Sequence, residues 1–115
     1  MKVTGLEQEL MDYDGVKHKL GGKPLTVKRA VLIALEASNQ DPKEIAMEEK
    51  SLRHRLADRV FASKDGNIVL KTEDITRIKE CLSDMFTPGV YGRCADVIDP
   101  PEDEEEEKNE QKNDK

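Results

Sequence analysis

The sequence predicts an α+β domain, mostly helical, in which about four helices pack with a small two- or three-stranded sheet. Three observations lead to this fold class. Four stretches between residues 27 and 98 place apolar residues at the helical period, short β-prone segments flank a pair of glycines, and the composition changes after residue 99. We therefore expect residues 1–99 to form a single globular domain with one modest core, and residues 100–115 to form a disordered acidic tail.

The acidic charge of the chain belongs to its last residues. From Pro101 onward eight acidic side chains stand against three lysines, so this segment carries a net charge of −5 out of −6 for the whole chain. The four glutamates at residues 104–107 repel one another and have no apolar surface to bury, which is typical of disordered segments. Three roles stay open for the tail: solvation, an intramolecular brake over a basic surface, and mimicry of a nucleic acid.

The first predicted elements are a β-hairpin and an apolar helix. Residues 15–20 alternate apolar and polar side chains before Gly21-Gly22, and residues 24–27 follow as a second short segment. This arrangement suits a hairpin turn that needs positive φ. Thr26 is expected to cap a helix over residues 27–37. Apolar side chains cover so much of this helix that we expect it to lie at the centre of the fold.

The second helix has two possible starts. Asp41 can cap it with Pro42 at the first helical position, or the helix can begin near Ala46 after an irregular linker. In both cases Glu49 and Arg53 have the i,i+4 spacing that slightly stabilises a helix. One apolar face is expected on this helix, formed by Leu52, Leu56, Val60 and Phe61.

The third helix follows a turn at residues 64–67 and the β-prone residues 68–70, which could pair with the early hairpin. Thr72 is expected to cap this helix, with Glu73 and Asp74 in its first turn, where acids interact favourably with the helix dipole. Its apolar stripe consists of Ile75, Ile78, Leu82, Met85 and Phe86.

A fourth helix is expected to start at Thr87 and Pro88, because proline is favourable at the first helical position. The glycines at positions 89 and 92 weaken it. It should end at Asp99, since a residue before proline avoids the α region.

The chain carries no catalytic or metal-binding signature. His18, His54, Cys81 and Cys94 are scattered, whereas structural zinc needs closely spaced ligand pairs. Both cysteines lie among apolar residues, as expected for buried thiols. No phosphate loop, dinucleotide fingerprint or nucleophile elbow occurs, and helix capping explains the acidic clusters. We therefore expect no enzyme, no metal and no cofactor.

The sequence also favours a cytoplasmic location. No apolar run approaches the length of a membrane span, and the first ten residues lack the apolar stretch of a signal peptide. Two lone cysteines do not make a disulfide scaffold. No contact with a membrane is expected, and the oligomeric state stays open.

Basic side chains near the hairpin and on the second helix are the candidate partner-binding surface. Interspersed acids and a nearly neutral body favour an ordinary solvated face over a nucleic-acid-binding patch, because nucleic-acid-binding domains are usually strongly basic. If the basic groups converged on one side, they could still contact phosphate. The candidate residues are Lys17, His18, Lys19, Lys23, Arg53, Arg55 and Arg59.

Several segments carry a resemblance to a group of known proteins. They are KPLT at residues 23–26, the EEK…R..LA pattern at residues 48–57, the L..EDI..IK pattern at residues 70–79, and the closing segment at residues 88–99. In this order the chain resembles small helical proteins of unassigned function encoded in tailed-bacteriophage genomes. The resemblance implies an intracellular phage or prophage product, and it transfers no active-site residues.

The leading hypothesis is a non-catalytic phage accessory protein that binds a viral or host protein in the host cytoplasm. The surfaces expected to make contact are the exposed side of residues 48–59 and the hairpin at residues 16–20. One alternative is a nucleic-acid-binding regulator that uses the basic hairpin and helix, with the acidic tail as brake. Another is a phage tail-assembly chaperone, which is a special case of protein binding.

Overall fold

The computed structural model describes residues 2–36 and 45–100. Within these two ranges the chain forms four helices and two small two-stranded antiparallel sheets, which confirms the predicted mostly helical α+β class. The predicted acidic tail, from residue 101 onward, lies outside the described residues. The helices are α1 (Val27–Glu36), α2 (Met47–Ala62), α3 (Thr72–Met85) and α4 (Pro88–Ile98), and the strands are β1 (Lys2–Val3), β2 (Lys19–Leu20), β3 (Lys23–Pro24) and β4 (Ile68–Val69).

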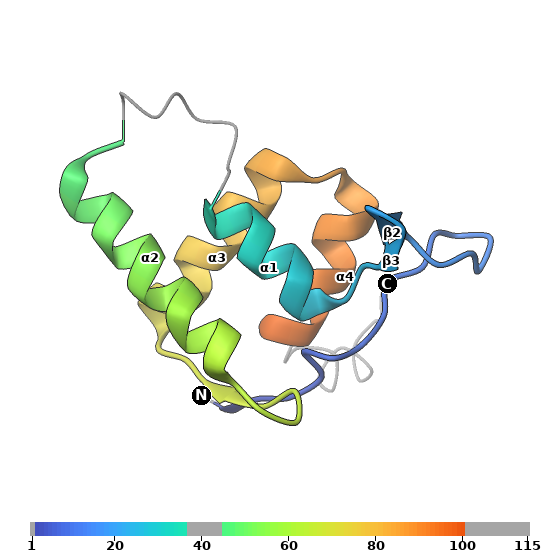
Figure 1. Ribbon diagram of the computed structural model, residues 1–115, viewed down its shortest axis with the longest axis horizontal. Coiled ribbons are helices and arrows are strands. Elements are labelled where there is room, and N and C mark those ends of the chain that lie inside the picture. Colours follow the sequence, from blue (N-terminus) through green and yellow to red (C-terminus); the bar gives the residue numbers. More distant parts are fainter. Residues whose placement is uncertain (1, 37–44, 101–115) are drawn as a thin grey trace, which may run out of the picture.

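Helix α1 lies at the centre of the fold, as its apolar circumference predicts. It packs against α2, α3 and α4, which surround it in Figure 1. The side chains that it buries are Val27, Ala30, Val31, Ala34 and Leu35. One continuous core joins these side chains to the buried faces of the other three helices. Burial of this apolar surface is the main stabilising contribution to the fold.

The first turn of α1 has its backbone donors satisfied by the N-terminal segment. The Val27 N–H donates to the carbonyl of Gln8 at 3.0 Å, and the Lys28 N–H donates to the carbonyl of Leu6 at 2.8 Å. The next N–H, that of Arg29, donates to the Thr26 hydroxyl at 3.1 Å, which confirms Thr26 as the cap.

The hairpin β2–β3 has the predicted position. Lys19 pairs with Pro24 and Leu20 with Lys23, and Gly21-Gly22 makes the turn with φ of +63° and +80°. Both central residues of this two-residue turn lie in the left-handed region, where glycine carries no steric penalty.

Strand β4 does not extend this hairpin, so the suggested pairing with it is wrong. It pairs with β1 instead, with Val69 opposite Lys2 and Ile68 opposite Val3. The turn before β4 explains the choice, because the carbonyl of Gly66 accepts the N–H of Leu6 at 3.1 Å and so brings the N-terminal segment alongside. A two-residue strand such as β1 carries no sequence pattern by which it could have been recognised.

Helix α2 begins at Met47 with Ala46 at its N-cap, so the second of the two predicted starts is correct. The alternative start at residues 41–42 lies outside the described residues. The predicted apolar face is correct at Leu56 and Val60 but wrong at Leu52 and Phe61, whose surfaces are 36% and 72% exposed. Successive residues differ by about 100° around a helix, so burying Val60 turns Phe61 outward. There its ring lies 5.9 Å from the Lys28 ammonium.

Helix α3 is capped one residue earlier than predicted. Its N-cap is Lys71 and Thr72 is its first helical residue, while the Asp74 carboxylate of the first turn accepts the Lys71 N–H at 3.0 Å. The buried stripe of α3 contains the predicted Ile75, Ile78 and Leu82.

Both cysteines are buried free thiols, as predicted. Cys81 belongs to α3 and Cys94 to α4, which begins at Pro88 after Thr87 as expected. Burial raises the pKa of Cys81, and it raises the pKa of Cys94 to about 12. The two thiols therefore stay protonated and pack as small apolar groups.

Candidate partner-binding surface

Residues 9–26, which we call the arm, project from the helical body beside α4 (Figure 1). A bridge between Glu9 and Thr26 closes the base of the arm. Above it, three backbone hydrogen bonds form a closed cycle. The Leu10 N–H donates to Leu25 O at 2.8 Å, the Leu25 N–H to His18 O at 2.9 Å, and the His18 N–H to Leu10 O at 2.9 Å. The segments around Leu10, His18 and Leu25 are thus held together by backbone hydrogen bonds, although no long strand is present.

The arm is anchored to the core through two of these three residues. The side chains of Leu10 and Leu25 are buried and belong to the core cluster. Because the same residues make the backbone cycle, the arm cannot move away without exposing apolar core surface to water.

The tip of the arm is a tight turn organised by Asp12. Its carboxylate accepts the N–H of Val16 at 2.9 Å and the N–H of Asp14 at 2.8 Å. The bond from Val16 is the main cause of a lowered pKa at Asp12, to which the Asp14 bond and the nearby His18 and Arg93 also contribute. The charge of Asp12 is therefore engaged within the turn.

Apolar side chains are unusually exposed along the arm. Eight large hydrophobic side chains are exposed among residues 2–36 and 45–100, and four of them belong to the arm. Tyr13 is 86% exposed and Val16 61%, while Met11 and Leu20 are closer to half exposed. The other four are distributed over α2 and β4. Grouped apolar exposure of this kind is characteristic of interaction sites.

A pocket of about 420 Å³ lies between the arm and the first turns of α4. The Tyr13 ring forms one wall, close to the backbone of Gly89, where an added Cβ would lie 3.6 Å from the ring. The guanidinium of Arg93 lies 5.4 Å from the centroid of the same ring. The lining residues are Met11, Asp12, Tyr13, His18, Thr87, Pro88, Gly89, Val90 and Arg93.

Four of the seven predicted site residues belong to the arm. His18 lines the pocket. Lys17 pairs with Glu9 at 2.8 Å, and this bond raises the pKa of Lys17. Lys19 and Lys23 lie exposed on the hairpin, and no carboxylate in the described part of the chain lies within ion-pair distance of either.

The other three predicted residues lie on α2, and two of them stabilise the fold. Arg53 pairs with Glu49 at 2.9 Å. Arg59 contacts the Asp74 carboxylate at 3.1 Å and donates to the Val69 carbonyl at 2.9 Å, so it ties α2 to α3 and β4. Arg55 is exposed on the same helix.

A second ion pair joins α2 to α3. Arg77 of α3 reaches the Glu49 carboxylate with two bonds, at 2.9 and 3.2 Å. The bond from Arg77 is the main cause of the lowered pKa of Glu49, and Arg53 adds to it. Arg53 and Arg77 therefore use their charge to bind Glu49 inside the fold.

The seven predicted residues belong to two groups, four in the arm and three on α2. In Figure 1 the hairpin and α2 lie on opposite sides of α1. The basic residues of the hairpin and those of α2 therefore come from separate parts of the backbone, and we describe each group by its own contacts.

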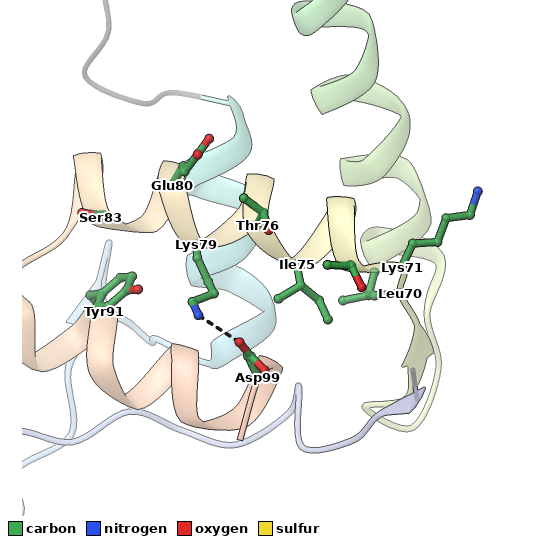
Figure 2. Close-up of a pocket in the computed structure, with 10 residues that line it drawn as sticks. Leu70, Lys71, Ile75, Thr76, Lys79, Glu80, Ser83, Tyr91 and Asp99 are labelled. Atoms are coloured by element: carbon green, nitrogen blue, oxygen red, sulfur yellow. Dashed lines mark hydrogen bonds and ion pairs between the residues drawn. The ribbon is translucent and has the colours of Figure 1, made fainter. Parts of the chain in front are cut away.

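A second pocket, of about 740 Å³, lies between α3 and α4 (Figure 2). Lys79 of α3 points across it to Asp99, with 2.9 Å between Nζ and the carboxylate. This bond raises the pKa of Lys79, which stays charged. The pair fastens the end of α4 to α3, and its two charges neutralise each other.

Neither a membrane span nor a metal cluster is found in the described part of the chain. None of its helices is long and apolar enough to cross a bilayer. Among the same residues, no three His, Cys, Asp or Glu side chains gather as metal ligands would.

The sequence analysis did not identify three residues that line the pocket, Tyr13, Gly89 and Arg93. Tyr13 stands between two aspartates and just before Gly15, and an aromatic residue in so polar a turn is expected to be exposed. That signal could have identified Tyr13. Arg93 and Gly89 offered no such signal, since only the fold brings α4 to the arm.

Comparisons with protein families, with curated proteins and with solved structures found no significant match for this chain.

Proposed function

We propose that this chain is a non-catalytic protein-binding domain that contacts its partner through the arm. The observation that carries the proposal is the exposure of Tyr13 and Val16 beside a pocket with apolar walls. Such surface is costly to leave in water, and burying it against a second protein is favourable. A rigid arm also loses little conformational entropy on binding, which favours affinity.

The exposed side of α2 is the weaker of the two surfaces expected from the sequence. Its charged residues are largely engaged with one another or with α3, as in the pairs Glu49–Arg53 and Arg59–Asp74. Breaking these pairs to contact a partner would weaken the packing of α2. A nucleic-acid-binding role receives less support for a related reason, because several of the basic groups are paired with acids, as Lys17 is with Glu9 and Arg59 is with Asp74.

We base the kind of partner that we propose on the resemblance to phage-encoded proteins. The partner would be a viral or host protein in the cytoplasm of an infected cell. A tail-assembly chaperone is the special case in which that partner is a viral tail protein.

Photo-crosslinking from defined positions tests the proposal. A photoreactive amino acid at Val16 samples the arm, and the same amino acid at Lys50, which is exposed on α2, is the matched control. In infected cells we expect a protein adduct from position 16 that is absent from position 50. An excess of wild-type chain without the photoreactive group should reduce the yield of this adduct, whereas an excess of the V16S/L20S variant should not.

Two outcomes would contradict the proposed function. Equal adducts from both positions would mean random collision. No competable adduct from position 16 would mean that the arm has no protein partner.

A further inference from the structure

The pocket beside the arm points to the chemistry of the partner, and this inference rests on the proposed function. With about 420 Å³, the pocket is at the small end of the range for ligand sites. Its walls include the Tyr13 ring, Pro88 and Val90, so the group that fills it best is apolar. One aromatic or aliphatic side chain, inserted as an anchor, matches this size and polarity.

The charges around the pocket are unbalanced. Asp12, the acid on its wall, keeps a negative charge that is stabilised by backbone N–H groups of the turn and by the nearby Arg93. Arg93 contacts the Tyr13 ring, and no carboxylate in the described ranges lies within ion-pair distance of it. The only other acid at the tip is Asp14, since Glu9 is paired with Lys17.

The hairpin next to the pocket adds further positive charge. Lys19 follows the pocket residue His18 directly, and Lys23 stands opposite Leu20 on the paired strand. Arg29 lies against the same hairpin, where its guanidinium donates to the carbonyls of Lys23 and Pro24. These cations make the hairpin that leads away from His18 positively charged, and positive charge attracts an acidic ligand.

We infer that the arm binds an acidic peptide segment of the partner protein, whose single apolar side chain enters the pocket between Tyr13 and α4. The carboxylates of the segment face Arg93 and the basic hairpin. The apolar anchor supplies most of the affinity, and the charges supply selectivity and a faster association.

The test uses the full chain and a short synthetic peptide in which glutamates flank one phenylalanine. Binding is followed by amide chemical shifts, and we expect the largest changes at Tyr13, His18 and Gly89. Two control peptides separate the contributions, one with serine for the phenylalanine and one with glutamine for the glutamates. Each should bind at least about tenfold more weakly, as expected when a buried apolar group or several charge contacts are lost.

Two glycines of α4 offer a matched pair of variants. G89L places a side chain in the pocket, where the Cβ itself makes only an ordinary contact of 3.6 Å with Tyr13, so the fold should hold. G92L adds the same side chain to the same helix at a position with nothing within 4 Å of the new Cβ. We expect G89L to reduce peptide affinity at least about tenfold and G92L to leave it unchanged.

Three results would overturn the inference. A glutamate-only peptide that binds as well as the anchored one would make a plain acidic tail the occupant. Self-association of the free chain that G89L abolishes would make a second copy the occupant. An equal reduction of peptide affinity in G89L and G92L would mean that the peptide binds outside this pocket. If crosslinking from position 16 succeeds while the peptide fails, the proposed function stands and only the partner's chemistry is wrong.

Discussion

Replacing Leu82 with alanine is the most direct test of the core. Leu82 lies on α3 with no exposed surface. Truncating a fully buried leucine removes transfer free energy and leaves a cavity, and together these cost about 2–5 kcal/mol. At about 0.05–0.15 kcal/mol per residue, the roughly ninety described residues would have a free energy of unfolding of about 5–14 kcal/mol. The substitution should therefore remove a large fraction of the total.

The measurement is equilibrium unfolding in urea, followed by far-UV circular dichroism. Met47→Ala is the matched control, because it shortens a side chain of similar size that is mostly exposed at the start of α2. It should change the free energy of unfolding by less than about 0.5 kcal/mol. Equal slopes in urea are required for the midpoints to be compared.

The refuting result is an unfolding midpoint for L82A that equals the midpoint of the Met47 variant. Such a result would mean that α3 does not pack its Ile78–Leu82 side against α1. The assignment of the whole stripe would then be wrong.

Three further predictions follow from individual contacts. E49Q should lower the free energy of unfolding by about 1 kcal/mol at neutral pH, because it weakens the bonds to Arg77 and Arg53. The pKa of Glu49 is lower in the folded than in the unfolded state, so its contribution to the free energy of unfolding is present above the unfolded pKa and is lost as pH falls through the folded pKa. The free energy of unfolding in urea should therefore fall less with acid for E49Q than for wild type. G66A should cost more stability in thermal unfolding than G15A: both have positive φ, but only at position 66 would a Cβ lie 3.0 Å from another residue's side chain. A chain ending at residue 99 should bind DNA and RNA no more tightly than the full chain across a salt series, and steep salt-dependent binding would revive the nucleic-acid alternative.

Helices were predictable here because each one carries its own signal. Thr26 begins α1 and an almost continuous apolar run sustains it, so local propensity and tertiary position agree. The same holds for the turn at Gly21-Gly22, where both residues need positive φ.

Pairings between distant segments were not predictable from the same information. Strand β1 has two residues, and its pairing with β4 depends on the Gly66 carbonyl reaching Leu6. Phe61 was placed on the wrong face because an apolar residue at the end of a helix fits either side of the stripe by spacing alone. Its exposure follows from how α2 packs on α1.

The candidate site divides in the same way. The exposure of the hairpin residues could be inferred because turns of this composition lie at the surface. The ion pairs of Arg53 with Glu49 and of Arg59 with Asp74 could not be settled in advance, since a sequence cannot tell a cation that faces solvent from one that meets a carboxylate. Arg93 was missed because it becomes relevant only once α4 packs beside Tyr13.

The placement of charge in the molecule is the reason why we propose the arm, and not α2, as the binding surface. Where α2 meets α3, Glu49 accepts bonds from two arginines and Asp74 from a third, so cation and acid compensate locally and hold two helices together. At the arm the Asp12 carboxylate is bound by the backbone and lies near Arg93, while the hairpin residues Lys19 and Lys23 have no carboxylate within ion-pair distance in the described part of the chain and lie beside exposed apolar groups. A surface that serves stability alone gains nothing from this combination, because the cations repel and the apolar groups stay hydrated. A ligand that supplies both carboxylates and one apolar side chain relieves both costs at once.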